Sequence, residues 1–236
     1  MYEGVLVESN GSTTASRFAT TAARLGFDGV VIRNIHQMMG EFDREKIGRV
    51  YDIDVVSGIE IVSDDRTEAS GYIGSYRPET TILILRGGNP EINRFAAEHE
   101  QIDVLADPMG RDGDLNHVIV AEATNNDVHV EVSLAPMLRH SGGQRVRALR
   151  SLRKLRELIE AYDAPYVVSA GATNHLQMRA PRELKAVGAE IGFEPEDIGD
   201  GLRAWKTIAR RNRERLSPEY VQPGVRRDPH PSDNDE

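Results

Sequence analysis

The sequence predicts an α/β protein in which a parallel sheet closes into a barrel surrounded by helices. Short apolar, β-branched segments alternate with longer amphipathic segments along the 236 residues. Roughly seven such strand–helix units are present, which favours a closed barrel over an open sheet. The length also suits a single barrel, which commonly needs ~250 residues.

The expected strands are apolar runs bounded by turn residues. The clearest is 80–85 (TTILIL), which has the continuous apolar character of a parallel strand buried on both faces. In chain order, the expected strands are 2–7, 30–32, 54–62, 80–85, 102–106, 128–134 and 166–169.

The expected helices carry recognisable start and stop signals. Asn89 and Pro90 form a helix start, and Gly192 forms a helix end. In the longest candidate, 141–162, apolar residues recur at spacings of three and four. The other helices are expected at 13–25, 90–99, 115–123, 181–191 and 197–212.

Composition bounds the domain organisation and the compartment. Residues 1–216 form the expected barrel domain, and 217–236 form an acidic tail that we expect to be disordered. No stretch approaches the ~20 apolar residues of a membrane span, and Met1–Gly4 lacks signal-peptide character. Because the chain also has no cysteine, we expect a cytoplasmic protein without disulfides or thiolate metal sites.

Charge is distributed unevenly along the chain. The net charge is −9, yet residues 139–227 carry 18 Lys and Arg against 11 Asp and Glu, whereas residues 1–138 carry 11 against 23. This asymmetry predicts a localised surface that binds a polyanion. Arg outnumbers Lys by 25 to 4, which suits bidentate phosphate contacts and equally suits a GC-rich genome.

The segment 139–156 contains seven Lys and Arg residues and no acid. Arg147, Arg150 and Lys154 fall on one face of the expected helix, so they would follow a phosphate backbone. The alternative is a solvated face that pairs with acidic residues elsewhere in the fold. The preceding Ser141–Gln144 would either hold a phosphate through its backbone N–H groups or form a plain loop with a helix cap.

Other charged residues are expected at the carboxyl ends of the strands, where barrels carry their functional groups. These strand-end candidates are Asn10, Arg33, Glu60, Arg86, Asp107, Ser133 and the loop from Ser169. A second basic cluster forms either the outer face of a capping helix or a contact with RNA or a protein. Its members are Arg203, Lys206, Arg210, Arg211, Arg213 and Arg215.

The sequence offers no familiar catalytic motif. No two histidines have the His-x-His spacing, and neither His-Glu-x-x-His nor Gly-x-Ser-x-Gly occurs. Glu60 lies on an expected strand, but one carboxylate is a poor metal site. We therefore expect no catalytic residues, no metal ligands and no cofactor bound by this chain.

Four segments resemble a known family, ribonuclease P protein component 3 of archaea (the 30-kDa ribonuclease P subunit family). Its pattern is a strand ending in Ser-x-Gly-Ala, followed by Arg-x-Pro-Arg-Asp/Glu-Leu at the start of a helix that ends in Ile/Leu-Gly. The resemblance extends over residues 2–216 and, with the acidic composition, points to a halophilic archaeon. The matching segments are Val167–Ala172, Arg179–Leu184, Val187–Gly188 and Ile191–Phe193.

The resemblance implies an irregular TIM-like barrel, related to metal-dependent phosphoesterases whose metal ligands the family has lost. Glu60 would be a relic of that site. The Asp that the family usually has on its first strand is either replaced here by Glu3 or has no counterpart in this chain. The family supports an RNA subunit that removes the 5′ leader of precursor tRNA with Mg²⁺. The implied partners are ribonuclease P RNA, ribonuclease P protein component 2, the other protein subunits and precursor tRNA.

Our leading hypothesis is therefore an RNA-supporting subunit of this endoribonuclease. Two alternatives stay open: a metal-dependent phosphoesterase using Glu60, Asp107, His129 and His175, and a scaffold that binds only protein. The expected RNA-binding residues are Arg86, Arg139, Arg145, Arg147, Arg150, Lys154, Arg179 and Arg182.

Overall fold

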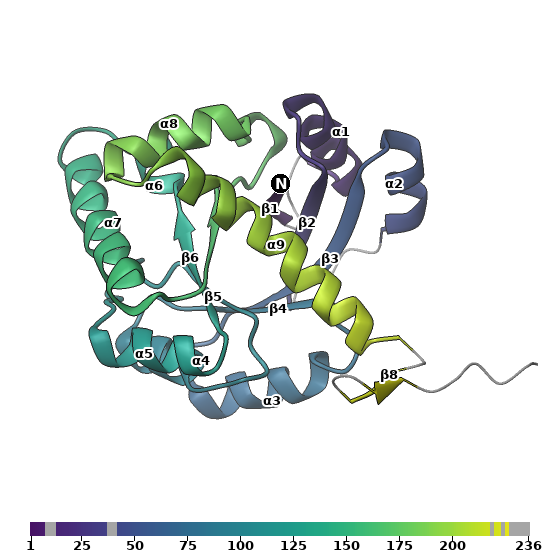
Figure 1. The fold of residues 1–236 in the computed structure, drawn as a ribbon, viewed down its shortest axis with the longest axis horizontal. Helices are drawn as coiled ribbons and strands as arrows, with labels where there is room; N and C mark the ends of the chain where they lie inside the picture. Colours follow the sequence, from purple (N-terminus) through teal and green to yellow (C-terminus); the bar gives the residue numbers. More distant parts are fainter. Residues whose placement is uncertain (8–12, 37–41, 218–219, 223–224, 227–236) are drawn as a thin grey trace, which may run out of the picture.

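A computed structural model of the chain describes residues 1–7, 13–36, 42–217, 220–222 and 225–226. Within these ranges, seven parallel strands form one sheet in chain order (Figure 1). They are β1 (Tyr2–Val7), β2 (Gly29–Ile35), β3 (Asp54–Ile61), β4 (Ile82–Arg86), β5 (Val104–Ala106), β6 (His129–Ser133) and β7 (Tyr166–Ser169).

Helices surround this sheet, and α9 runs diagonally across one end of it (Figure 1). A 3₁₀ helix, η1 (His175–Gln177), follows β7, and the hairpin β8 (Tyr220–Gln222) and β9 (Val225–Arg226) follows α9. The α-helices are α1 (Ala15–Leu25), α2 (Arg44–Tyr51), α3 (Arg66–Tyr76), α4 (Pro90–Ala97), α5 (His117–Asn125), α6 (Ala135–Arg139), α7 (Gly142–Tyr162), α8 (Pro181–Ile191) and α9 (Pro195–Arg215).

The sheet curls until the chain after its last strand meets its first. Val5 and Ala172 form a parallel bridge, in which the Leu6 N–H donates to the Ala172 carbonyl at 2.9 Å. The result is a nearly closed barrel with one strand fewer than the usual eight. The predicted irregular TIM-like barrel is therefore confirmed.

Apolar residues form two layers, one between the sheet and the helices and one inside the barrel. The inner layer comes from alternate strand residues such as Val31, Val56 and Ile84, because side chains of a strand alternate between its faces. Trp205 and Ile208 of α9 complete this layer at the end of the barrel that α9 crosses. Burial of this apolar surface is the main contribution to the stability of the fold.

Helix α9 lies close to the strands because glycines on both sides of the contact leave room, Gly4 on β1 and Gly201 on α9. A Cβ on Gly4 would lie 2.9 Å from the Trp205 ring, and one on Gly201 would lie 2.4 Å from Val168. The Trp205 indole N–H donates to the Val168 carbonyl at 2.9 Å. The amino ends of the strands, called the closed end below, are thus covered by α9.

Three helices were not predicted. Helices α2 and α3 begin at good caps, Asp43 and Asp65, but bury only Ile47 and the pair Ala69 and Ile73, so their apolar periodicity is weak. The third, α6, is only five residues long. The remaining predicted helices and strands are present with shifted ends.

Parts of the prediction lie outside the described residues. Asn10 and most of the expected tail, including 227–236, fall there. The disorder of the tail and the domain boundary at 216 stay predictions. Among the described helices, none combines the length and apolar character that crossing a membrane requires.

Candidate nucleic-acid interface

The carboxyl ends of the strands, called the open end below, surround a cavity of about 750 Å³. Its floor consists of strand-end side chains, and one wall consists of residues from α6 and α7. Among the residues lining the cavity are five that were predicted at the strand ends: Arg33, Glu60, Arg86, Asp107 and Ser133.

The cavity floor is an ion-pair network built on Arg33, called the floor network below. Arg33 Nε donates to Glu60 Oε2 at 3.0 Å, and its Nη1 donates to Glu131 Oε1 at 2.6 Å. Arg86 Nε donates to the other Glu60 oxygen at 2.5 Å, and Ser169 Oγ donates to Glu131 at 2.6 Å. Two guanidinium groups thus neutralise two carboxylates.

Because the floor network is buried, its charged groups strongly shift one another's pKa values. Burial alone would raise the pKa of Glu131, but the Arg33 guanidinium outweighs it and holds that pKa below its usual range. The same two carboxylates raise the pKa of Arg33 despite its burial. The network is therefore a fixed structural unit, and its carboxylates already bind guanidinium.

This arrangement does not assemble the metal site of the phosphoesterase hypothesis. Glu60 and Asp107 lie at the open end, whereas His129 begins β6 at the closed end and His175 is hydrogen-bonded to Thr13. Within the described ranges, no group of three or more His, Asp or Glu side chains could hold a metal ion. This alternative is therefore not favoured.

The predicted RNA-binding residues differ in their surroundings. Arg86, Arg139 and Arg147 line the cavity, and Arg145 lies beside it on the first exposed turns of α7 with its Nε bonded to the His140 carbonyl. Arg150 is also exposed and, among the described residues, has no hydrogen-bond or ion-pair partner. These residues place exposed positive charge along α7, and their role in RNA binding stays a prediction.

Three of the predicted residues have other environments. Lys154 Nζ contacts both Asp114 carboxylate oxygens, at 2.5 and 2.8 Å, so its charge is neutralised within the fold. Arg179 donates to two backbone carbonyls and lies near Arg139. Arg182 is exposed in the first turn of α8 and is not among the residues that line the cavity.

The sequence did not indicate that two carboxylates, Glu131 and Glu3, are buried beside the site. A single acid inside the apolar run 128–134 was the available signal for Glu131, since a buried charge requires a partner. Glu3 Oε1 accepts from the Ala170 N–H at 2.9 Å, and Arg139 donates to the carbonyl of the same Ala170 at 2.9 Å. Burial raises the pKa of Glu3 to about 8, so the group is mostly protonated at neutral pH.

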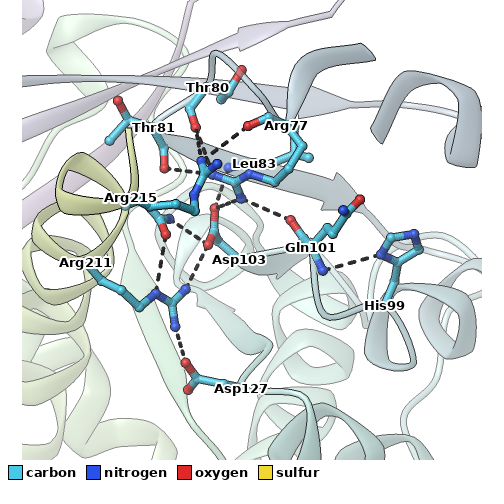
Figure 2. A network of polar contacts seen from close by, with 11 residues as sticks. Arg77, Thr80, Thr81, Leu83, His99, Gln101, Asp103, Asp127, Arg211 and Arg215 are labelled. Atoms are coloured by element: carbon cyan, nitrogen blue, oxygen red, sulfur yellow. Dashed lines mark hydrogen bonds and ion pairs between the residues drawn. The ribbon is translucent and has the colours of Figure 1, made fainter. Parts of the chain in front are cut away.

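The second basic cluster behaves differently, because most of it is bonded within the fold at the closed end (Figure 2). Arg211 donates to Asp103 at 2.8 Å and contacts Asp127, and Arg215 donates to the Thr80 carbonyl at 3.1 Å. Arg213 pairs with Asp54 of β3, and Arg203 pairs with Glu196 of its own helix. This supports the capping-helix interpretation for these four arginines.

These features define an α/β barrel with an arginine-rich open end. The family RNase P subunit p30 matches residues 1–217, and the chain therefore belongs to this family. The chain is 49% identical over 226 residues to ribonuclease P protein component 3 of Natronomonas pharaonis, covering 96% of this chain and 94% of the relative. It is 47% identical to the protein of that name from Haloarcula marismortui, covering 96% of each.

Solved structures give the same fold. A chain in the cryo-EM structure of archaeal ribonuclease P with mature tRNA superimposes with a TM-score of 0.81 at 23% identity, covering 100% of both chains. A putative histidinol phosphatase from Listeria monocytogenes matches with a TM-score of 0.53 at 11% identity, covering 75% of this chain and 97% of the phosphatase. The barrel is therefore of the TIM-like type found in phosphatases.

Proposed function

We propose that this chain is a cytoplasmic protein subunit of ribonuclease P that supports the catalytic RNA in removing the 5′ leader of precursor tRNA. In this function the RNA, with Mg²⁺, hydrolyses the phosphodiester bond, and the chain supplies positive charge. Its partners are the ribonuclease P RNA, protein component 2 and the other protein subunits. Family membership and the relatives' names support this assignment.

The observation that carries the proposal is the surplus of arginine at the open end. The floor network is neutral in itself, whereas Arg139, Arg147 and Arg150 form no ion pair within the described part of the chain. Folded RNA concentrates phosphate charge, and arginine neutralises it through bidentate contacts. Because these arginines are unpaired in an otherwise acidic protein, an anionic partner would bind them with a favourable electrostatic energy.

The test is cleavage of precursor tRNA at limiting Mg²⁺ by the RNA and the partner subunits, with and without this chain. We expect the chain to increase the cleavage rate and to lower the Mg²⁺ requirement. Incubation of the chain alone with precursor tRNA should give no product. An unchanged rate, or cleavage by the metal-loaded chain alone, would reject the proposal.

A protein-binding scaffold is separated from this function by crosslinking in the assembled particle. A photoreactive group placed at Gln144, which lines the cavity wall, should crosslink to RNA. A crosslink only to another protein subunit would favour the scaffold. The same group placed at Glu45 on α2, on the other side of the barrel from α7, serves as the control (Figure 1).

A further inference from the structure

We propose that the cavity at the open end binds the phosphate group of a single unpaired nucleotide of RNA, with Arg139 and Arg147 as the contacting residues. The identity of the ligand rests on the proposed function, whereas the site itself rests on the geometry of the cavity. The floor network occupies the strand ends, so the phosphate would lie between this floor and the wall formed by α6 and α7.

Charge balance across the cavity points to an anion. Arg33 and Arg86 on the floor are matched by Glu60 and Glu131. Of the remaining lining residues, Arg111 is paired with Asp64 outside the cavity lining. Among the described residues that line the cavity, Arg139 and Arg147 are then opposed only by Asp107, which leaves an excess of positive charge there.

The two wall arginines retain unused donors. Arg139 makes one hydrogen bond, from Nη2 to the Ala170 carbonyl, and Arg147 makes none among the described residues. A guanidinium has five N–H donors, so both can contact phosphate oxygens. Burial and the neighbouring Arg179 lower the pKa of Arg139, and Glu3 offsets this only in part.

The cavity has the size of a nucleotide site. Its volume of about 750 Å³ falls in the range of small-molecule pockets, roughly 300–1,000 Å³. A duplex is too wide to enter, so the site would select an unpaired nucleotide. The apolar part of the wall, which includes Pro136 and Ala148, would pack against the base or the sugar.

Asp107 makes the site sensitive to pH. Burial and the Glu131 carboxylate raise the pKa of Asp107 to about 6, although its side chain reaches the solvent of the cavity. Below that pH the carboxyl is neutral and no longer repels a phosphate. The charged and titratable groups that surround it or share its cavity are Arg33, Glu60, Arg86, Arg111, Glu131, Arg139, His140 and Arg147.

The test is binding of fluorescein-labelled penta-uridylate to the full chain, followed by fluorescence anisotropy. Arg147→Ala should weaken binding by about tenfold, the loss of one charge-assisted contact. Arg44→Ala is the matched control, because Arg44 is an exposed arginine of α2, on the other side of the barrel from α7 (Figure 1), and does not line the cavity. It should weaken binding by less than about twofold, since it removes one screened charge.

A second pair of measurements tests the position of the phosphate. Asp107→Asn should tighten binding several-fold at pH 7.5, and the two proteins should bind equally at pH 5. The penta-uridylate has a 5′-hydroxyl in one arm and a 5′-phosphate in the other. An Arg147 effect on both assigns an internal phosphodiester, and an effect confined to the second assigns a terminal phosphate.

Two results would overturn the inference. Equal losses from Arg147→Ala and Arg44→Ala would show that the oligonucleotide is held by the overall charge of the protein and not in the cavity. Unaltered binding in Asp107→Asn at pH 7.5 would do the same. If these results occur while the chain still stimulates precursor tRNA cleavage, the cavity site is rejected and the proposed function stands. If the variants bind the oligonucleotide as predicted but the chain does not stimulate cleavage, only the proposed function is rejected.

Discussion

The two ends of the barrel use arginine in opposite ways. At the closed end, Arg77 and Arg211 share the buried Asp103 (Figure 2). At the same end, Arg213 binds Asp54 through two hydrogen bonds of 2.8 Å. At the open end, Arg139 and Arg147 form no ion pair within the described chain. The comparison shows that the number of arginines in a segment does not reveal their role. What decides it is whether an acid lies within reach.

The largest effect is expected from Asp103→Ala at the closed end. Asp103 accepts from Arg77 Nη1 at 2.6 Å, from Asn212 Nδ2 at 2.7 Å and from the Leu83 N–H at 2.8 Å. Its removal leaves a buried guanidinium unpaired, which costs about 3–5 kcal/mol of unfolding free energy. Urea unfolding measures this loss.

The matched control for that variant is Asp127→Ala. Asp127 also binds Arg211, but its side chain is 62% exposed. Exposed pairs contribute roughly 0–1 kcal/mol, so we expect a small loss. Similar losses in the two variants would show that the closed end is not held by its buried charges.

The next effect concerns Glu3, which supports the open end through Ala170. Its pKa is raised to about 8 in the folded chain, above the usual value near 4.5. The folded state therefore binds the proton more tightly, and the stability that this gives is lost as the pH rises from about 4.5 through 8. Glu3→Gln should remove most of this loss. At pH 8.5 the unfolding free energy of the variant should exceed that of the wild-type chain by about 2 kcal/mol or more.

Unfolding of both proteins across pH 4 to 9 checks this prediction. The wild-type chain should lose stability relative to Glu3→Gln with increasing pH, and the two should converge toward pH 4. Parallel curves would mean that Glu3 is ionised in the folded chain. In that case Ala170 would be positioned by a carboxylate.

The smallest effect on stability is expected at the open end. Replacing Arg145, Arg147 and Arg150 together with Ala should change the unfolding free energy by less than about 1 kcal/mol, because none of them pairs with an acid in the part of the chain that the structure describes. The variant should bind ribonuclease P RNA more weakly, with a salt slope lower by about 2. Unchanged RNA binding or an unchanged slope would remove α7 from the RNA surface.

Much of this fold was predictable, because strands and helices are encoded locally. The run 80–85 predicted β4, and the apolar spacing of 141–162 predicted α7. The weakly amphipathic α2 and α3 were missed for the same reason, since tertiary packing and capping stabilise them. Local patterns therefore predicted the barrel and not every element around it.

The site was predictable only in outline. The segment 139–156 indicated a basic helix, but the pairing of Lys154 with Asp114 joins residues 40 positions apart. Asp54 and Arg213 are 159 positions apart, so the sequence left the role of the second basic cluster open. Partner acids are brought together by the closure of the barrel, and local sequence does not encode that.

The central claim is that the open end supplies positive charge to an RNA that performs the chemistry. Its most direct test is single-turnover cleavage of precursor tRNA by the assembled particle over a range of Mg²⁺ concentrations. The variant is Arg139→Ala, Arg147→Ala and Arg150→Ala combined. The control is Arg44→Ala, Arg49→Ala and Arg210→Ala combined. It removes three exposed arginines of α2 and α9 that have no acid partner among the described residues.

We predict that the open-end variant will need more Mg²⁺ than the wild-type chain and will reach the same rate at saturating Mg²⁺, because the RNA retains its catalytic groups. The control should follow the wild-type curve. Equal Mg²⁺ requirements for the variant and the control, or loss of cleavage by the variant at every Mg²⁺ concentration, would contradict the account.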